Sequence, residues 1–197
     1  MILIGCEESG VVTTAFRNAG YEAYSCDLQP TRGNPEWHIQ GDVLDILGDG
    51  WDLLIGHPVC KYLANSGVCH LHTEEGRWEK MEQAKEFFYK LWEAPIDRIC
   101  LENPIPHKYG LGKTYTQIIQ PYQFGHPEQK ATCLWLKNLP KLKETDNVKE
   151  YMKTLPKKDQ QKKHYASPGP DRERFRSETY LGIAQAFVDQ WGPLINR

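Results

Sequence analysis

Cys60 has the setting of a candidate nucleophile. It follows the apolar run Leu53–Ile55 and the chain-breaking stretch 56–58, so we expect it in a polar loop just past a buried strand. Open α/β sheets bind their ligands at the edge where the parallel strands end, and a thiolate is the strongest nucleophile available near neutral pH. Free cysteines are also among the most buried residues, so the alternative is a Cys60 that only fills space at the end of a strand.

Three acidic residues stand at the ends of other predicted strands. Asp27, Asp42 and Glu102 each end a short run that is typical of a strand, and these runs are 21–26, 38–42 and 98–102. Because the carboxyl ends of parallel strands meet at one edge of a sheet, we expect the three carboxylates to gather near Cys60. Asp42 has an alternative role as the cap of a short helical turn predicted at 43–47.

The N-terminal segment predicts the nucleotide-binding half of a Rossmann-like fold. A strand at 1–6, a turn that contains Gly10, a helix at 11–19 and a second strand that leads to Asp27 follow one another. The glycines at positions 5 and 10 would let the backbone approach a ligand, and Asp27 could accept hydrogen bonds from two ribose hydroxyls. Ser9 is placed to cap the helix.

The acidic residues in this turn bear on the choice of cofactor. Glu7 and Glu8 stand at the start of the helix, where they would repel a pyrophosphate. A sulfonium or ammonium ligand without phosphates suits the turn better. The sequence therefore favours S-adenosylmethionine over NAD.

The remaining periodic segments complete an α/β domain. The aromatic and aliphatic spacing predicts helices at 74–92 and 176–191, and a further strand is expected at 130–136. We predict one domain over residues 1–197, with a mostly parallel sheet and helices on both faces. Segment 137–175 is expected to be a basic loop, since residues 149–176 hold nine basic and four acidic side chains.

Composition excludes several classes of protein. The chain has 197 residues, of which 40% are hydrophobic and 25% charged, and its net charge of −2 gives no global attraction to nucleic acid. No apolar run approaches the ~20 residues of a membrane span, and no basic leader precedes an apolar core. The six cysteines are then expected to be reduced thiols in the cytoplasm.

A thiolate beside a carboxyl group and a methyl donor suits one particular chemistry. Sulfur adds to carbon 6 of an electron-poor pyrimidine while the carboxyl group shares a proton with ring nitrogen 3. Carbon 5 then becomes nucleophilic enough to accept a methyl group. In this scheme Cys60 is the nucleophile and Glu102 the proton partner of the base.

The order and spacing of these residues resemble the DNA cytosine-5 methyltransferases. The turn at Gly5–Gly10, Asp27 and Gly41–Val43 resemble the family's cofactor motifs, and Pro58–Cys60 stands where the family has Pro-Pro-Cys. Further motifs are similar to the loop after the nucleophile, to Glu-Asn-Val, to Gly-Pro-Gln and to the closing helix, and they lie at 65–67, 102–104, 125–130 and 177–192. The chain also resembles compact proteins of this type encoded in phage and prophage genomes.

The resemblance implies a Rossmann-like S-adenosylmethionine-dependent methyltransferase fold and a set of site residues. The implied cofactor-binding residues are Gly5, Cys6, Glu7, Gly10, Asp27, Leu28, Asp42, Val43, Pro58 and Ser177. The implied substrate-binding residues are Asn65, Ser66, Asn103, Gln129 and Lys130. The implied partner is DNA or single-stranded nucleic acid, with a free nucleotide as an alternative.

The chain departs from the family at three places. Val59 replaces the second proline, and the two arginines that face the base in the family fall on Ala131 and Cys133. Lys130 could compensate, although an alternating strand would point it to the other face. Segment 137–175 is also too short for the family's separate target-recognition domain.

These departures leave other functions open. One is a catalytically impaired module that binds cofactor or nucleic acid, and another is an enzyme that modifies a pyrimidine nucleotide. An NAD-linked oxidoreductase is a more distant alternative. A metal site built from Cys60, Cys69, His70 and His72 is a poor match to zinc signatures, so no metal is expected.

Overall fold

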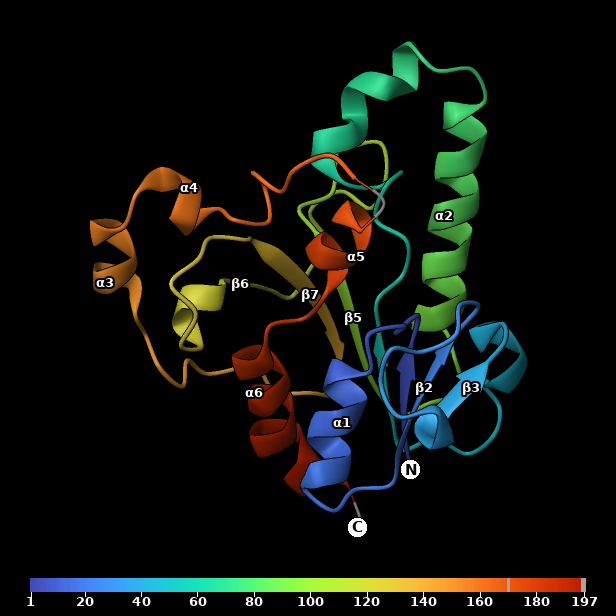
Figure 1. The fold of residues 1–197 in the computed structure, drawn as a ribbon. Coiled ribbons are helices and arrows are strands. Elements are labelled where there is room, and N and C mark those ends of the chain that lie inside the picture. The colour runs from blue at the N-terminus through green and yellow to red at the C-terminus, as the bar shows by residue number, and fades with distance from the viewer. Residues whose placement is uncertain (170, 196–197) are drawn as a thin grey trace.

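A seven-stranded sheet forms the centre of the computed structural model, which describes residues 1–169 and 171–195 (Figure 1). The strands lie in the order β3-β2-β1-β4-β5-β7-β6. The first five are parallel, and β7 runs antiparallel to both of its neighbours. Their bounds are β1 (Ile2–Gly5), β2 (Ala23–Asp27), β3 (His38–Gln40), β4 (Leu53–Gly56), β5 (Arg98–Pro104), β6 (Gln117–Ile119) and β7 (Thr132–Lys137).

Helices cover both faces of the sheet. On one face α1 (Val11–Asn18) and α6 (Leu181–Trp191) pack against each other, and on the other lies α2 (Arg77–Trp92) (Figure 1). The central strands are buried on both sides because alternate residues enter different cores. In β4, for example, Leu53 and Ile55 contact the α1–α6 side, whereas Leu54 contacts the α2 side. This arrangement confirms the predicted Rossmann-like α/β fold.

Most predicted elements are present with small shifts at their ends. The clearest correction concerns the last helix, predicted as one piece over 176–191 but broken into α5 (Arg172–Ser177) and α6. The chain is extended at Glu178 and Tyr180, where the Glu178 carbonyl accepts a hydrogen bond from Lys163 Nζ at 2.6 Å and the Tyr180 hydroxyl donates to Glu128 at 3.0 Å. Tertiary hydrogen bonds therefore interrupt a helix that its apolar spacing alone would continue. The short edge strand β6 was not predicted.

Segment 137–175 is also more ordered than predicted. Instead of a plain loop it contains α3 (Lys149–Thr154) and α4 (Lys157–Gln160), which lie beyond β6 in Figure 1, and it ends within α5. The backbone amide of Gln129 donates to the Gln160 carbonyl at 2.6 Å, which fixes α4 beside the chain that enters β7. No helix in the described part of the chain is both long and apolar enough to cross a membrane.

The N-terminus of α1 is capped by Glu7, not by Ser9 as predicted. The Glu7 carboxylate is buried and accepts hydrogen bonds from the amides of Val12 (2.6 Å) and Thr13 (3.2 Å) and from the Thr13 hydroxyl (2.6 Å). Ser9 makes only a long 3.4 Å contact to the amide of Val11. An anionic cap also interacts favourably with the positive end of the helix dipole.

We expect Glu7→Ala to lower the free energy of unfolding by about 2 kcal/mol, because it removes a charged cap and leaves buried amides unpaired. Ser9→Ala is the matched control and should cost less than about 0.5 kcal/mol. Urea denaturation of the two variants measures the difference. Equal losses for both would contradict Glu7 as the cap.

Candidate active site

A pocket of about 710 Å³ opens where β1, β2 and β4 end. The predicted cofactor-binding residues that line it are Cys6, Glu7, Asp27, Leu28, Asp42, Val43 and Ser177. The other three predicted cofactor-binding residues, Gly5, Gly10 and Pro58, are not part of the lining that the described residues form. A Cβ on Gly5 would lie 3.0 Å from Val43 Cγ2, and one on Gly10, whose φ is +68°, would lie 2.9 Å from the Gly33 Cα. The two glycines thus allow close packing around the pocket.

The two predicted cofactor carboxylates lie in this lining as the strand-end argument predicts. Asp27 Oδ1 accepts from the amide of Gln29 at 2.9 Å, and Asp42 Oδ1 accepts from that of Leu44 at 2.9 Å. Asp42 therefore caps the short 3₁₀ helix Val43–Ile46, which was its alternative role, while still lining the pocket. Within the described structure, Oδ2 of each carboxylate has no hydrogen-bond partner and can serve a ligand.

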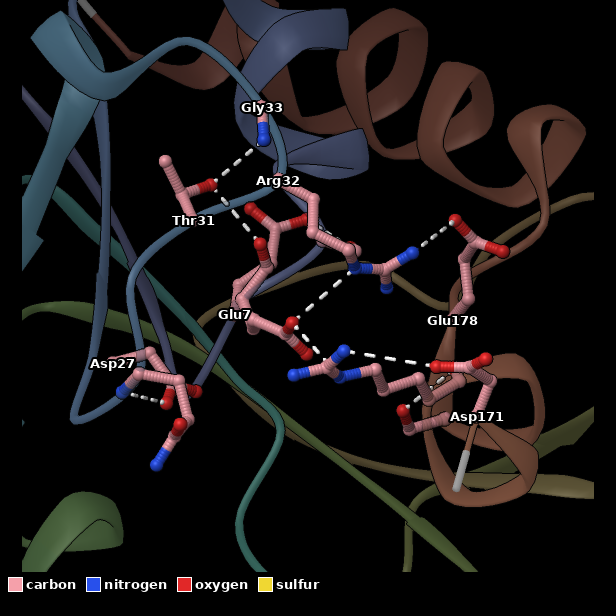
Figure 2. Close-up of polar contacts among 12 residues, drawn as sticks. Glu7, Asp27, Thr31, Arg32, Gly33, Asp171 and Glu178 are labelled. Atoms are coloured by element: carbon pink, nitrogen blue, oxygen red, sulfur yellow. Dashed lines mark hydrogen bonds and ion pairs between the residues drawn. The ribbon is translucent and has the colours of Figure 1, made fainter. Parts of the chain in front are cut away.

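Ion pairs hold the segment around α5 over the mouth of the pocket. Glu8 lies 3.3 Å from the guanidinium of Arg32 and 3.3 Å from that of Arg174. Arg32 also reaches Glu178 at 3.8 Å, and Arg174 reaches Asp171 at 3.7 Å (Figure 2). The network joins the turn before α1, the loop after β2 and α5, which are distant in sequence. Residues 173 and 177–179 consequently form one wall of the pocket.

The second group of predicted residues lies beside this pocket, at the ends of β4 and β5. His57 lines the pocket, and its Nδ1 lies 3.0 Å from Oε2 of Glu102. Asn103 is buried and its Nδ2 donates to the Pro58 carbonyl at 3.1 Å, which ties the end of β5 to the loop that carries Cys60. The structure thus brings the predicted nucleophile loop and Glu102 together.

The environment of Cys60 disfavours the thiolate in the resting protein. Cys60 is exposed as a residue, yet the protein packed around its sulfur raises the pKa of the thiol above 9.0. The Lys130 ammonium opposes this, Glu102 adds to it, and Arg176 opposes it more weakly. The largest influence that favours the thiolate is therefore the charge of a lysine.

The argument from strand alternation does not apply to Lys130, because this residue lies before the strand begins. Strand β7 begins at Thr132, and the amide of Lys130 instead donates to the Gln120 side chain at 3.0 Å. Alternation along β7 therefore does not direct its side chain. The positive charge of Lys130 lowers the pKa values of Cys60 and Glu102, so its ammonium lies on the side of the proposed reaction centre.

Three other predicted substrate-binding residues lie on the protein surface. Asn65 and Ser66 are exposed in the 3₁₀ helix Asn65–His72 that follows the Cys60 loop. Gln129 is exposed and accepts from Gln161 at 3.2 Å. These three residues keep their predicted role as an expectation.

An exposed aromatic cluster adjoins the Cys60 loop. The rings of Trp78 and Tyr109 lie 5.4 Å apart, His72 lies 5.5 Å from Trp78, and the Lys108 ammonium lies 4.8 Å from the Tyr109 ring. Trp78 and Tyr109 are 42% and 39% exposed. The cluster is tied to the loop through His107, which hydrogen-bonds to the carbonyls of residues 62 and 63 at 3.0 Å each.

Sequence reasoning missed three members of this site. His57 was treated only as a strand breaker, Arg32 was not considered, and Lys163 was counted only among basic surface residues. Lys163 is in fact buried, and burial together with Lys130 lowers its pKa to about 8. Only His57 carried a usable signal, namely a titratable side chain at the end of a buried strand. In the described chain, no group of three or more His, Cys, Asp or Glu side chains is arranged to hold a metal ion.

No protein-family model matches this chain, and no curated protein sequence matches it. Three solved structures resemble it in part. A protein described as a DNA modification methyltransferase encoded within an E. coli prophage has a TM-score of 0.44 and 13% identity, over 68% of this chain and 45% of its own. The methyltransferase EhMeth of Entamoeba histolytica has a TM-score of 0.45 and 12% identity, over 75% and 57%. The Dnmt2 methyltransferase of S. pombe has a TM-score of 0.43 and 14% identity, over 99% and 66%.

The chain therefore spans 45% to 66% of the length of these structures. A likeness at these TM-scores carries no argument about activity. The fold is established by the sheet itself, and the function has to be argued from the site.

We expect Arg174→Ala to loosen α5 by removing one of the two guanidinium groups on Glu8. Amide hydrogen exchange of residues 171–179 should become about two- to fivefold faster, since a partly exposed ion pair contributes roughly 0.2–1 kcal/mol. The difference should shrink in 1 M salt. Lys153→Ala, which removes an ion pair with Glu150 in α3, is the control and should leave residues 171–179 unchanged. Unchanged exchange in Arg174→Ala would show that packing, not charge, holds this wall.

Proposed function

We propose that this protein transfers a methyl group from S-adenosylmethionine to carbon 5 of cytosine in DNA through a covalent adduct with Cys60. One observation carries the proposal. A pocket lined by strand-end carboxylates adjoins the loop that carries Cys60, and Glu102 of β5 and Lys130 before β7 both influence Cys60 at the same edge of the sheet. Few reactions other than covalent pyrimidine methylation use all of these groups together.

The lining of the pocket fits S-adenosylmethionine better than a dinucleotide. The anion site at the N-terminus of α1, where a Rossmann fold binds pyrophosphate, is occupied by the protein's own Glu7 carboxylate. Asp27 and Asp42 can accept from ribose hydroxyls and from the adenine amino group. Arg32 offers a partner for the cofactor's carboxylate, and Glu178 one for its ammonium. When bound, this cofactor supplies an electrophilic methyl group.

Each of four residues of the chain has its own role in the reaction of the base. Cys60 adds to carbon 6, and Glu102 presents a carboxyl group to ring nitrogen 3. Lys130 stands in for the missing arginines: its ammonium favours the thiolate and can donate to the carbonyl oxygen of the base. Asn103 fixes the loop so that these groups converge.

The substrate class that the surface favours is single-stranded nucleic acid. Exposed aromatic rings with a neighbouring lysine can stack on unpaired bases, and this needs no separate recognition domain. A duplex would first have to flip out its base, at a cost of a few kcal/mol. A free nucleotide is the remaining alternative, and it would not use the aromatic cluster.

The raised pKa of Cys60 and the lowered pKa of Glu102 favour a second candidate, a module that binds cofactor without turnover. In the resting protein both groups carry the protonation state opposite to the one that catalysis needs. The two candidates differ in one readout, the formation of methylated product.

Tritium transfer from methyl-labelled S-adenosylmethionine tests the proposal on duplex DNA, single-stranded DNA, RNA and deoxycytidine monophosphate. We expect counts in the single strand that fall by about a thousandfold or more in Cys60→Ser, because the covalent step is lost. Cys69→Ser is the matched control, since Cys69 is also an exposed thiol, and it should retain near wild-type activity. Cofactor binding with no counts on any substrate would establish the non-catalytic module instead.

Lys130→Ala should lower kcat/KM by about a hundredfold or more, by analogy with the loss of one donor to a developing negative charge. Lys130→Arg should recover part of the loss, because it keeps the cation. An independent readout is alkylation of Cys60 by iodoacetamide, followed by peptide mass spectrometry. Without the Lys130 charge the thiolate fraction falls and Cys60 should react more slowly, while Cys69 serves as the internal control. Equal Cys60 alkylation in Lys130→Ala and wild type would remove Lys130 from the site.

A further inference from the structure

The contacts of Glu102 favour its ionised form, whereas the proposed reaction needs a proton from it. To activate cytosine, this carboxyl group has to give a proton to ring nitrogen 3. Burial raises the pKa of Glu102, but the hydrogen bond and the charge of His57 outweigh burial and lower it. Both side chains are largely buried, 12% exposed for Glu102 and 15% for His57. At neutral pH Glu102 is therefore ionised, and the proton that the reaction needs has to come from elsewhere.

His57 has the geometry to hold that proton. Its Nδ1 lies 3.0 Å from Glu102 Oε2, and its Nε2 is buried without a hydrogen-bond partner in the described structure. Leaving a buried polar atom unpaired is costly, and a catalytic role is one of the reasons for which such an atom is retained. His57 also lines the cofactor pocket and lies three residues before Cys60. It is thus in contact with both halves of the site.

The charges around His57 favour its protonated form. Burial lowers the pKa of His57, but the hydrogen bond and charge of Glu102 and the charge of Glu7 raise it, and Lys130 opposes them. The net effect is a pKa above the ordinary value of 6.5. The positive charges of Lys130 and Lys163, in addition to His57, lower the pKa of Glu102. The pair therefore shares one dissociable proton that is held to a higher pH than on a free imidazole, and it resides mainly on His57.

We propose that His57 and Glu102 act as a proton relay, in which His57 stores the proton that Glu102 delivers to ring nitrogen 3 of the substrate. This inference rests on the proposed methyl transfer to cytosine. His57 acts through Glu102 and is a positioning residue that also supplies the proton.

The relay balances through one turnover. As the Cys60 thiolate bonds to carbon 6, the electrons of the 5,6 double bond move to the 4,5 bond, and those of the 3,4 bond move to nitrogen 3, which takes the proton of Glu102. The proton of His57 passes to Glu102 and leaves the imidazole neutral. The electrons of the 4,5 double bond then form the bond from carbon 5 to the methyl group, whose bond to the sulfonium sulfur breaks and leaves a neutral thioether, and the 3,4 double bond re-forms with nitrogen 3 protonated. Carbon 5 next loses its proton to water, the 5,6 double bond re-forms and Cys60 leaves as the thiolate. The proton on nitrogen 3 then returns through Glu102 to His57.

The relay predicts a distinctive dependence of rate on pH. The active form needs a Cys60 thiolate and a protonated pair, and the pair titrates below the thiol. The wild-type rate should therefore rise about tenfold per pH unit up to the pKa of the pair. It should then level off, because each gain in thiolate is matched by an equal loss of the stored proton. The pH at which the profile levels off therefore gives the apparent pKa of the His57–Glu102 pair.

His57→Asn is the decisive variant, because its amide can still donate a hydrogen bond to Glu102 but cannot store a proton. The break should then move down toward the pKa of Glu102 itself, and the rate on the plateau should fall about tenfold for each unit of this movement. A purely structural His57 predicts a break and plateau like those of the wild type, and this result would overturn the relay.

A titration by NMR separates failure of the relay from failure of the proposed function. We expect the imidazole of His57 to titrate above 6.5 in the wild type and at a lower pH in Glu102→Gln, with no cofactor or substrate present. A His57 that titrates at or below 6.5 in the wild type would overturn the relay. Absence of methyl transfer by the wild type on every substrate would instead count against the proposed function, and it is read without any His57 variant.

Discussion

The buried carboxylate of Glu7 is the interaction on which the arrangement of the site depends. It satisfies amides at the start of α1 and thereby fixes the turn that joins β1 to this helix. Because α1 and α6 pack against each other on one face of the sheet, the same turn also bears on the position of the C-terminal helix relative to the pocket. A carboxylate at this place also excludes a second anion. The helix terminus that other Rossmann folds use for phosphates is used here for the protein's own stability.

The strand ends divide the site into two electrostatically different halves. The pocket side is rich in carboxylates, with Glu7, Asp27 and Asp42 in its lining, and suits a ligand that carries positive charge. On the other side Lys130 acts on Cys60 and Glu102, which suits a substrate whose ring becomes negative during reaction. His57 lines the first half and is hydrogen-bonded to Glu102 in the second. This division is consistent with the proposed methyl transfer between a cationic donor and an electron-rich carbon.

The sequence predicted the backbone of this site better than its side-chain partners. Asp27, Asp42, Cys60 and Glu102 were all placed at strand ends, because short apolar runs that stop at polar residues identify buried parallel strands. The cap of α1 was assigned to Ser9 because local preference was the only guide, whereas the carboxylate of Glu7 turns back into the helix. The break between α5 and α6 arises from Lys163 and Glu128, which are distant in sequence. The pairing of His57 with Glu102 is likewise a contact between residues distant in sequence. It depends on the register of β4 and β5 and on the side-chain rotamers, which a sequence pattern does not specify.

The ion pairs around α5 hold a helix that contributes to the wall of the pocket. In the segment where the resemblance implies a target-recognition domain, the described part of the chain has three short helices, and of these α5 reaches the pocket. That helix is held by partly exposed charges on Glu8 and Arg174, so its attachment is weak and sensitive to salt. The same wall carries Arg176, whose positive charge slightly lowers the pKa of Cys60, so a segment attached by partly exposed ion pairs contributes to the electrostatics of the candidate nucleophile.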